Sequence, residues 1–367
     1  MNINPLLQIK ALGQSIWLDY IQRNMLENGE VARMIKEDGL AGITSNPAIF
    51  EKAINEHHDY DDAITSLTHR DTPPNEIYET LALEDIARAA ELFRPLYDES
   101  NGRDGFVSLE VSPHVAYDTQ QTINEAERLW AALNRPNVLI KVPATQAGLP
   151  AITHLLAAGI NINVTILFSL ERYRQVVDAF LAGMETRVAQ HKPVDHITSV
   201  ASFFLSRIDV LVDKRLDELV QITGDKSVSA LRGKAAIACA RLAYQYYQQW
   251  IRDNRWQSLS SHGARAQRLL WASTGTKDPA YSDIKYVEPL IAKDTINTMP
   301  LETLNAYRDH GQPAVRIEQE LDESGSLLEK LHQIGIDLEA VGEQLEGEGV
   351  QKFSVPFDKL LERIKQW

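Results

Sequence analysis

The most chemically informative residue of the sequence is Lys141, because its amine lies within an apolar run. Residues 138–142 read VLIKV, and such a run predicts a buried strand. Burial disfavours the ammonium form and so lowers the pKa of a lysine. A neutral amine can attack a ketone and form an imine. The alternative is a structural lysine that reaches the strand end or pairs with Glu110 or Asp19. For a lysine considered alone, this alternative is the more common one.

Other polar residues interrupt the apolar runs, and a polar residue in a buried strand requires a physical reason. These residues are Asp19, Thr44, Ser45, Asn46, Glu110, Asn163, Thr165, Ser199, Ser202, Ser273 and Thr274, with Lys277 just beyond the last run. The set combines an amine, carboxylates, amides and hydroxyls, without a group of His or Cys residues. It therefore favours carbonyl and hydroxyl chemistry over metal or thiol chemistry, and we expect no metal site.

The runs that carry these residues alternate with longer helical patterns, which indicates α/β structure with a parallel sheet. Eight runs are predicted as strands: 15–19, 41–45, 106–111, 138–143, 162–168, 197–204, 269–274 and 295–299. Helices are predicted over 118–133, 170–188, 208–220 and 235–250. Eight strands are the number that a closed (β/α)8 barrel of the TIM type requires. In such a barrel the chemistry lies at the carboxyl ends of the strands.

Two long segments extend the predicted barrel with additional helices. The connection at about 205–267 is too long for one crossover, so we expect two helices packed outside the barrel. Residues from about 312 to 367 read as helix throughout. Because no repeat or linker divides the chain, residues 1–367 are predicted to form a single domain.

Composition excludes several classes of function. The chain has 367 residues and a formal net charge of −14, which argues against a nucleic-acid-binding surface. An anionic substrate would require cations placed near it. The one cysteine, Cys239, cannot form an intrachain disulfide, and no apolar run approaches the length of a membrane span. A cytoplasmic protein without a membrane partner is the interpretation that fits.

Five motifs carry a resemblance to a known family, and they occur in that family's order. They are GITSNP at 42–47, VSLEV at 107–111, VLIKVPAT at 138–145, NINVTILF at 161–168 and WASTGTK at 271–277. In these motifs the chain resembles the transaldolases, which are Schiff-base enzymes of the non-oxidative pentose phosphate pathway. The resemblance extends from about residue 15 to the C-terminus, and it implies a single (β/α) barrel with extra helices.

The resemblance implies a transferase reaction that proceeds through an imine on Lys141. Lys141 would bind C2 of a ketose phosphate, and Asp19 would take the proton of the C4 hydroxyl as the C3–C4 bond breaks. Glu110 would move protons through a water held by Thr165. A dihydroxyacetone unit would pass from sedoheptulose 7-phosphate to glyceraldehyde 3-phosphate, giving erythrose 4-phosphate and fructose 6-phosphate. Because the imine and its enamine spread the developing charge, no cofactor is expected.

The resemblance also implies the contacts to phosphorylated sugar substrates. The expected residues are Thr44, Asn46, Asn163, Ser202, Phe204, Arg207, Ser273 and Lys277. Asn46 and Asn163 would hold hydroxyls of the dihydroxyacetone unit, and Ser202 would contact its C1 hydroxyl. Phosphate would bind Arg207, Ser273 and Lys277. The better-known branch has an arginine soon after this serine, whereas Lys277 is offset by an insertion that contains Gly275 and Thr276. A lysine binds phosphate as a point charge, without bidentate geometry. This departure and the long insertion after Phe204 lead us to interpret the chain as a divergent branch.

Two alternatives to transaldolase remain open at the level of the sequence. The first is a fructose-6-phosphate aldolase, which releases free dihydroxyacetone and uses a tyrosine at the place of Phe204. A phenylalanine cannot hydrogen-bond a proton-donating water, so Phe204 favours retention and transfer. The second is a non-catalytic barrel that binds sugar phosphates, and the joint presence of Lys141, Asp19 and Glu110 argues against it. A homodimer is expected from the family alone.

Overall fold

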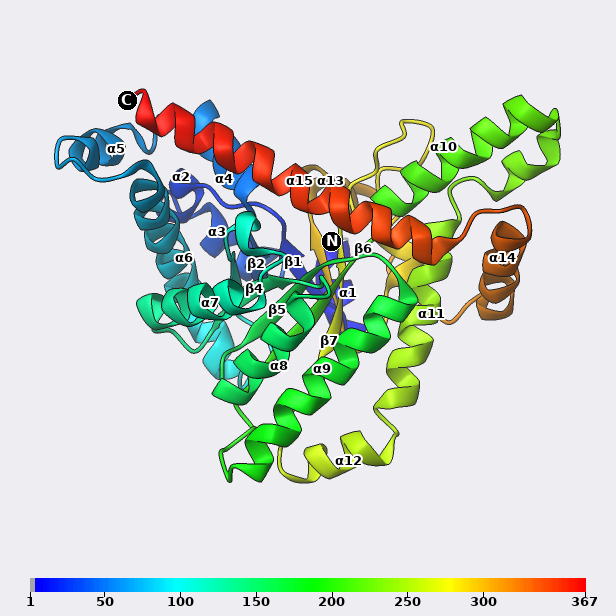
Figure 1. Cartoon of the computed structure of the whole chain (residues 1–367), viewed down its shortest axis with the longest axis horizontal. Coiled ribbons are helices and arrows are strands. Elements are labelled where there is room, and N and C mark those ends of the chain that lie inside the picture. The colour runs from blue at the N-terminus through cyan, green and yellow to red at the C-terminus, as the bar shows by residue number, and fades with distance from the viewer. Residues whose placement is uncertain (1–3) are drawn as a thin grey trace.

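Eight parallel strands close into a barrel at the centre of the molecule (Figure 1). The computed structural model describes residues 4–367, and residues 1–3, which the predicted domain includes, lie outside that range. The strands are β1 (Ser15–Leu18), β2 (Leu40–Thr44), β3 (Phe106–Glu110), β4 (Val138–Pro143), β5 (Ile162–Leu167), β6 (Ser199–Phe204), β7 (Arg268–Ala272) and β8 (Thr295–Met299). All eight predicted strands are confirmed, and they follow one another around the barrel in chain order.

Helices surround the barrel. The α-helices are α1 (Pro5–Ala11), α2 (Arg23–Glu27), α3 (Glu30–Glu37), α4 (Pro47–Glu56), α5 (Asp61–Thr68), α6 (Pro74–Glu99), α7 (Thr119–Leu133), α8 (Gly148–Ala158), α9 (Leu170–Ala189), α10 (Ser206–Thr223), α11 (Ala235–Trp250), α12 (Asn254–Ser261), α13 (Leu301–His310), α14 (Leu321–Gln333) and α15 (Leu338–Lys365). Short 3-10 helices are η1 (Pro113–Val115), η2 (Lys226–Leu231) and η3 (Glu288–Leu290). The four predicted helices correspond to α7, α9, α10 and α11. Across residues 4–367, no helix combines the length and the apolar character needed to cross a membrane.

The register of three adjacent strands places three polar side chains side by side. Glu110 in β3 is paired with Lys141 in β4, and Lys141 is paired in turn with Asn163 in β5. Paired residues of a parallel sheet point to the same face, and every residue of these strands is buried. The barrel therefore holds a carboxylate, an amine and an amide in one layer among aliphatic side chains.

Two predictions about the added helices are wrong in detail. The connection between β6 and β7 contains three α-helices, α10, α11 and α12, instead of two. Gly224 ends α10 in the left-handed conformation, and the Asp253 side chain caps α12 as a separate helix. The C-terminal region is not helical throughout, because residues 311–320 form an irregular segment that contains Pro313. Proline lacks the amide hydrogen that a continuing helix requires.

The C-terminal helix α15 runs across the end of the barrel (Figure 1), and two of its glycines allow a close approach to the end of β5. A Cβ at Gly342 would lie 2.7 Å from Cβ of Ser169, and a Cβ at Gly349 would lie 2.9 Å from Cγ2 of Ile166. Ile166 has a φ of +56° at a point where the register of β5 against β6 is irregular. A β-branched residue is strained in this left-handed region, so the packing of α15 holds the bend in place.

Replacing Gly342 by Ala is expected to destabilise the fold, because the added methyl group would collide with Ser169 and displace α15. Overpacking of this kind costs about 1–3 kcal/mol. The matched control is Gly347→Ala in the same helix, where nothing lies within 4 Å of the added Cβ. That change should stabilise the helix by up to about 1 kcal/mol. Thermal unfolding measures both variants, and equal shifts in Tm would show that α15 does not dock through Gly342.

Candidate active site

A cavity of about 140 Å³ lies at the carboxyl ends of the barrel strands, where a barrel of this type carries its chemistry. The residues that line it are Asp19, Thr44, Asn46, Lys141, Thr165, Ser202, Phe204, Arg207, Ala272, Ser273, Gly275, Lys277, Thr298, Pro300 and Phe353. Ten of the twelve predicted site residues are in this set. The other two, Glu110 and Asn163, contact lining residues from behind. The structure therefore brings the predicted residues together at one site.

Lys141 is buried between a carboxylate and a backbone carbonyl, with only 4% of its surface exposed. Its Nζ lies 2.9 Å from Oε2 of Glu110 and donates a hydrogen bond of 2.9 Å to the carbonyl oxygen of Ser45. The ring of Phe353 from α15 lies over the amine, with its centroid 5.9 Å from Nζ. The ammonium is therefore held close to a group that can take its proton, at the wall of the cavity.

Glu110 is the proton acceptor that this geometry offers. Burial raises the pKa of Glu110, and the nearby Lys141 ammonium offsets part of that rise. Oε2 of Glu110 is paired with the Lys141 amine, whereas the buried Oγ1 of Thr165 has no hydrogen-bond partner within the described chain. Buried polar atoms without protein partners commonly bind an ordered water. A carboxyl with a raised pKa can both accept and return a proton in one cycle.

Asp19 supplies a second carboxylate at the cavity. Its Oδ1 accepts a hydrogen bond of 2.6 Å from the Thr44 hydroxyl, which lies 2.7 Å from the Thr298 hydroxyl. Burial raises the pKa of Asp19, while the hydrogen bond from Thr44 and the charges of Lys141 and two further cations lower it in part. Asp19 therefore lines the same cavity as the amine, and a carboxylate with a raised pKa is able to accept a proton there.

The predicted amides have different positions relative to the cavity. Asn46 lines it, and its Oδ1 also accepts a hydrogen bond from the Ile49 amide at the start of α4. Asn163 lies beneath the cavity, where its Oδ1 accepts a 2.6 Å hydrogen bond from Ser202 and its Nδ2 donates one of 3.0 Å to Ser108. Because Asn163 is fully buried in this chain, its direct contact with a substrate stays a prediction.

Arg207 and Lys277 bring positive charge to the cavity. Arg207 is the second residue of α10, and burial lowers its pKa, while the charges of Glu348 and Asp19 oppose that shift. The start of α10 is fastened to the end of β7, because the Ser206 and Ser273 hydroxyls lie 2.9 Å apart. The local cations oppose the net negative charge of the chain, as an anionic substrate requires.

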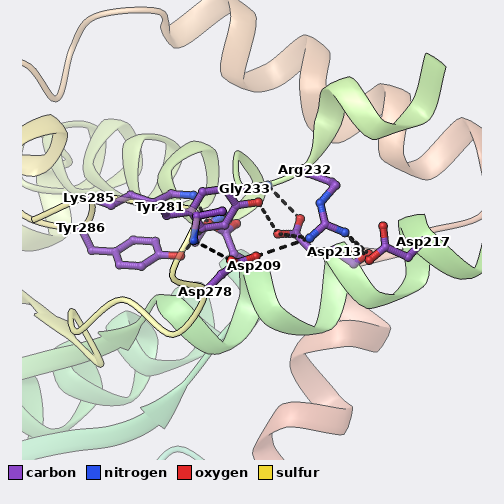
Figure 2. Close-up of polar contacts among 11 residues, drawn as sticks. Asp209, Asp213, Asp217, Arg232, Gly233, Asp278, Tyr281, Lys285 and Tyr286 are labelled. Carbon is purple, nitrogen blue, oxygen red and sulfur yellow. Dashed lines mark hydrogen bonds and ion pairs between the residues drawn. The ribbon is translucent and has the colours of Figure 1, made fainter. Parts of the chain in front are cut away.

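The loop between β7 and β8, which carries Lys277, is fastened to α10 by two buried carboxylates (Figure 2). Tyr281 donates a hydrogen bond of 2.7 Å to Oδ2 of Asp213, and Tyr286 donates one of 2.9 Å to Oδ2 of Asp209. Asp209 and Asp213 lie one turn apart, so they present one face of α10 to the loop. Since α10 begins at the cavity, these bonds fix the loop relative to the site.

The same carboxylates also fix the start of α11. The amide of Gly233 donates to Oδ1 of Asp213, and the amide of Ala236 donates to Oδ1 of Asp209, both at 2.8 Å. Gly233 has a φ of +66°, and a Cβ there would lie 2.5 Å from Nζ of Lys285. Lys285 in turn lies 3.3 Å from Oδ2 of Asp209. Loop, α10 and α11 therefore form one connected polar network, part of which Figure 2 shows.

Sequence reasoning missed several residues of the cavity, including Thr298 and Phe353. Thr298 obeys the rule that found the others, since it lies near the carboxyl end of β8. The sequence around Phe353 does not indicate a role in the site, because only the path of α15 brings this residue to Lys141. Phe204 packs on Phe168 with ring centroids 5.2 Å apart and forms an apolar side of the cavity.

The fold and the cavity define a class: a (β/α)8 barrel with a buried amine, two carboxylates and nearby cations at its mouth. Among residues 4–367, no group of three or more His, Cys, Asp or Glu side chains could hold a metal ion. The chain matches the family model described as Transaldolase/Fructose-6-phosphate aldolase over residues 16–364, and it belongs to that family.

Curated relatives resemble the chain over its whole length. A protein named Transaldolase 2 from Nostoc sp. (strain PCC 7120) is 47% identical, and the match covers 100% of this chain and 98% of that protein. A transaldolase from Trichodesmium erythraeum is 46% identical with the same coverage. A transaldolase from Thiobacillus denitrificans is also 46% identical, with 99% of this chain and 100% of that protein covered.

Asp19→Asn is expected to stabilise the fold at neutral pH, because it removes a partly buried charge. Burial raises the folded-state pKa of Asp19 above its ordinary value of 3.8. Its contribution to stability is therefore fully present below pH 3.8 and is lost as the pH rises through the folded-state pKa. The variant avoids this loss, so its Tm should exceed that of the parent by about 2 °C at pH 8. The difference should shrink as the pH is lowered to about 4. A constant difference would contradict the raised pKa.

Proposed function

We propose that this chain is a transaldolase of the non-oxidative pentose phosphate pathway that works through an imine on Lys141. It transfers a dihydroxyacetone unit from sedoheptulose 7-phosphate to glyceraldehyde 3-phosphate, giving erythrose 4-phosphate and fructose 6-phosphate. The observation that carries the proposal is the distance of 2.9 Å between Lys141 Nζ and Glu110 Oε2 beside a cavity that Asp19 also lines. Relatives named transaldolase over the full length of the chain support the same activity.

Imine formation uses the buried ion pair. The Lys141 ammonium passes a proton to Glu110, and the neutral amine attacks C2 of the ketose. A proton moves from the nitrogen to the C2 oxygen, which gives the carbinolamine. Glu110 then returns its own proton, through a water bound by Thr165, to the C2 hydroxyl. The C2–O bond breaks, a water molecule leaves, and an iminium ion remains on Lys141. The buried Thr165 hydroxyl, which has no hydrogen-bond partner within the described chain, supports the position of the relaying water.

Carbon–carbon cleavage uses Asp19. The Asp19 carboxylate removes the proton of the C4 hydroxyl, and the C3–C4 bond breaks. The electrons of that bond move into the iminium and form an enamine. An aldose phosphate leaves, and the enamine stays on Lys141. Attack of the enamine on a second aldehyde phosphate reverses these steps. The raised pKa of Asp19 suits a group that must take and return a proton.

The phosphate of the substrate binds Arg207, Ser273 and Lys277 in this proposal. All three line the cavity, and Arg207 lies in the first turn of α10, whose positive end favours an anion. Asn46, Asn163 and Ser202 are proposed to hold the dihydroxyacetone hydroxyls, with Asn163 acting from beneath through Ser202. The proposal also includes a single working domain, a cytoplasmic location and a homodimer.

Transfer and aldol cleavage differ in their dependence on an acceptor. With fructose 6-phosphate and erythrose 4-phosphate, sedoheptulose 7-phosphate should form. Without the acceptor, free dihydroxyacetone should appear about 100-fold more slowly, because Phe204 offers no hydroxyl to support protonation of the enamine. Product analysis by mass spectrometry measures both rates. Release of dihydroxyacetone at a comparable rate without acceptor would instead identify an aldolase, and no product at all would favour the non-catalytic barrel.

Lys277→Ala is expected to raise the KM for fructose 6-phosphate by about 10–100-fold, since a hydrogen bond to a charged group contributes about 1.5–3 kcal/mol. Tyr281→Phe removes the hydroxyl that donates to Asp213 and fastens the loop, and it keeps the ring. It should raise the KM by about fivefold, with kcat unchanged.

Unphosphorylated fructose is the control donor for this pair of variants. Both changes should affect its kcat/KM much less than that of fructose 6-phosphate, because no phosphate is bound. A loss of the same size with both donors would mean that Lys277 and its loop do not serve the phosphate.

A further inference from the structure

A second cavity, of about 320 Å³, lies on the other side of the ion pair. The residues that line it are Pro47, Asn75, Tyr78, Glu79, Ala82, Leu109, Glu110, Val111, Ser112, Pro113, His114, Glu125, Arg128, Leu129, Phe357 and Leu361. Glu110 lines this cavity and not the cavity of about 140 Å³, whereas Lys141 lines only the smaller one. The Lys141–Glu110 pair therefore separates a substrate cavity from a rear cavity, as we name the two.

The rear cavity connects the protein surface to Glu110. Asn75, His114 and Arg128 are exposed residues at its rim, whereas Leu109 and Glu110 are buried. Helix α15 contributes to both cavities, since Phe353 lines the substrate cavity and Phe357, one turn later, lines the rear one. His114 Nε2 lies 2.8 Å from Oδ1 of Asp358, which ties the rim to the same helix.

The rear cavity has the polar lining that water requires. Glu125 accepts a 2.8 Å hydrogen bond from the Ser112 amide, which leaves its second carboxylate oxygen available for a further bond. Burial and the negative charge of Glu110 raise the pKa of Tyr78, so its hydroxyl stays protonated and can donate. The volume is sufficient for several hydrogen-bonded waters, each of which takes up about 30 Å³ in the liquid.

The proposed reaction creates a need for such a path. Each imine formation at Lys141 releases one water, and each imine hydrolysis consumes one. A sugar phosphate occupies the substrate cavity during these steps, and Phe353 covers the amine. A water that leaves through the substrate cavity would have to pass the bound sugar.

We propose that the rear cavity is the path by which water reaches and leaves Glu110 while a sugar phosphate occupies the substrate cavity. The inference rests on the proposed imine chemistry. The Lys141 ammonium gives its proton to Glu110, the C2–O bond of the carbinolamine breaks as Glu110 returns that proton, and the water formed moves past Glu110 into the rear cavity. Hydrolysis runs the same path in reverse, and no other reactant is required.

Filling the rear cavity tests this path without altering a catalytic residue. Ala82→Phe on α6 and Leu129→Phe on α7 each place a ring in it, and two sites guard against misfolding of one variant. Exchange of the C2 oxygen of fructose 6-phosphate in ¹⁸O-labelled water is followed by mass spectrometry. Rapid-quench borohydride trapping gives the rate and final amount of imine. Exchange and trapping rates should both fall about tenfold, with the final amount of adduct unchanged. An obstructed path slows the formation and the hydrolysis of the imine equally, so the equilibrium amount of imine is unchanged.

The matched control is Ala132→Phe, which adds the same ring to an exposed position of α7 and should leave both rates at the parent value. Circular dichroism and Tm verify that each variant is folded. Parent rates in a folded filled variant would overturn the proposal, as would a loss in the amount of adduct, which would mean a distorted site. If the parent protein formed no adduct on Lys141, the imine chemistry itself would fail, and the two failures are therefore distinguishable.

Discussion

The buried ion pair between Lys141 and Glu110 is the constraint on which the rest of the structure depends. Two charges removed from water lose several kcal/mol of hydration each, and only close pairing and further hydrogen bonds offset that loss. The pairing of β3 with β4 aligns the two residues, and the Ser45 carbonyl accepts a hydrogen bond from the amine. A proton transfer within the pair removes both charges at once, so the arrangement is poised for the neutral amine that imine chemistry needs.

The segments that complete the site lie far from Lys141 in the sequence. Helix α15 docks on the strained Ile166 through Gly349 and places Phe353 over the amine. Helix α10 begins with Arg207 at the cavity, and its acidic face holds the loop that carries Lys277. These additions convert a common barrel into a site with one covered face and one cationic region.

Much of the fold could be predicted from the sequence, because each strand is a short apolar run and the runs alternate with helical periodicity. Much of the site could also be predicted from the sequence, since polar residues at strand ends, such as Asp19 and Lys141, converge in any barrel. Periodicity could not place Phe353, whose role depends on the path of a distant helix. It also could not show that Asn163 lies beneath the cavity or that 311–320 is irregular, because these depend on strand stagger and on tertiary packing.

The central claim is that Lys141 forms the covalent intermediate. Treatment with fructose 6-phosphate and borohydride, followed by peptide mapping, tests it most directly. The expected result is a reduced sugar adduct on Lys141 in the parent and in Asp19→Asn, and no adduct in Lys141→Met. In Asp19→Asn the adduct should retain all six carbons, since cleavage is blocked after the imine forms. An adduct on a different lysine, or none in the parent protein, would contradict the claim.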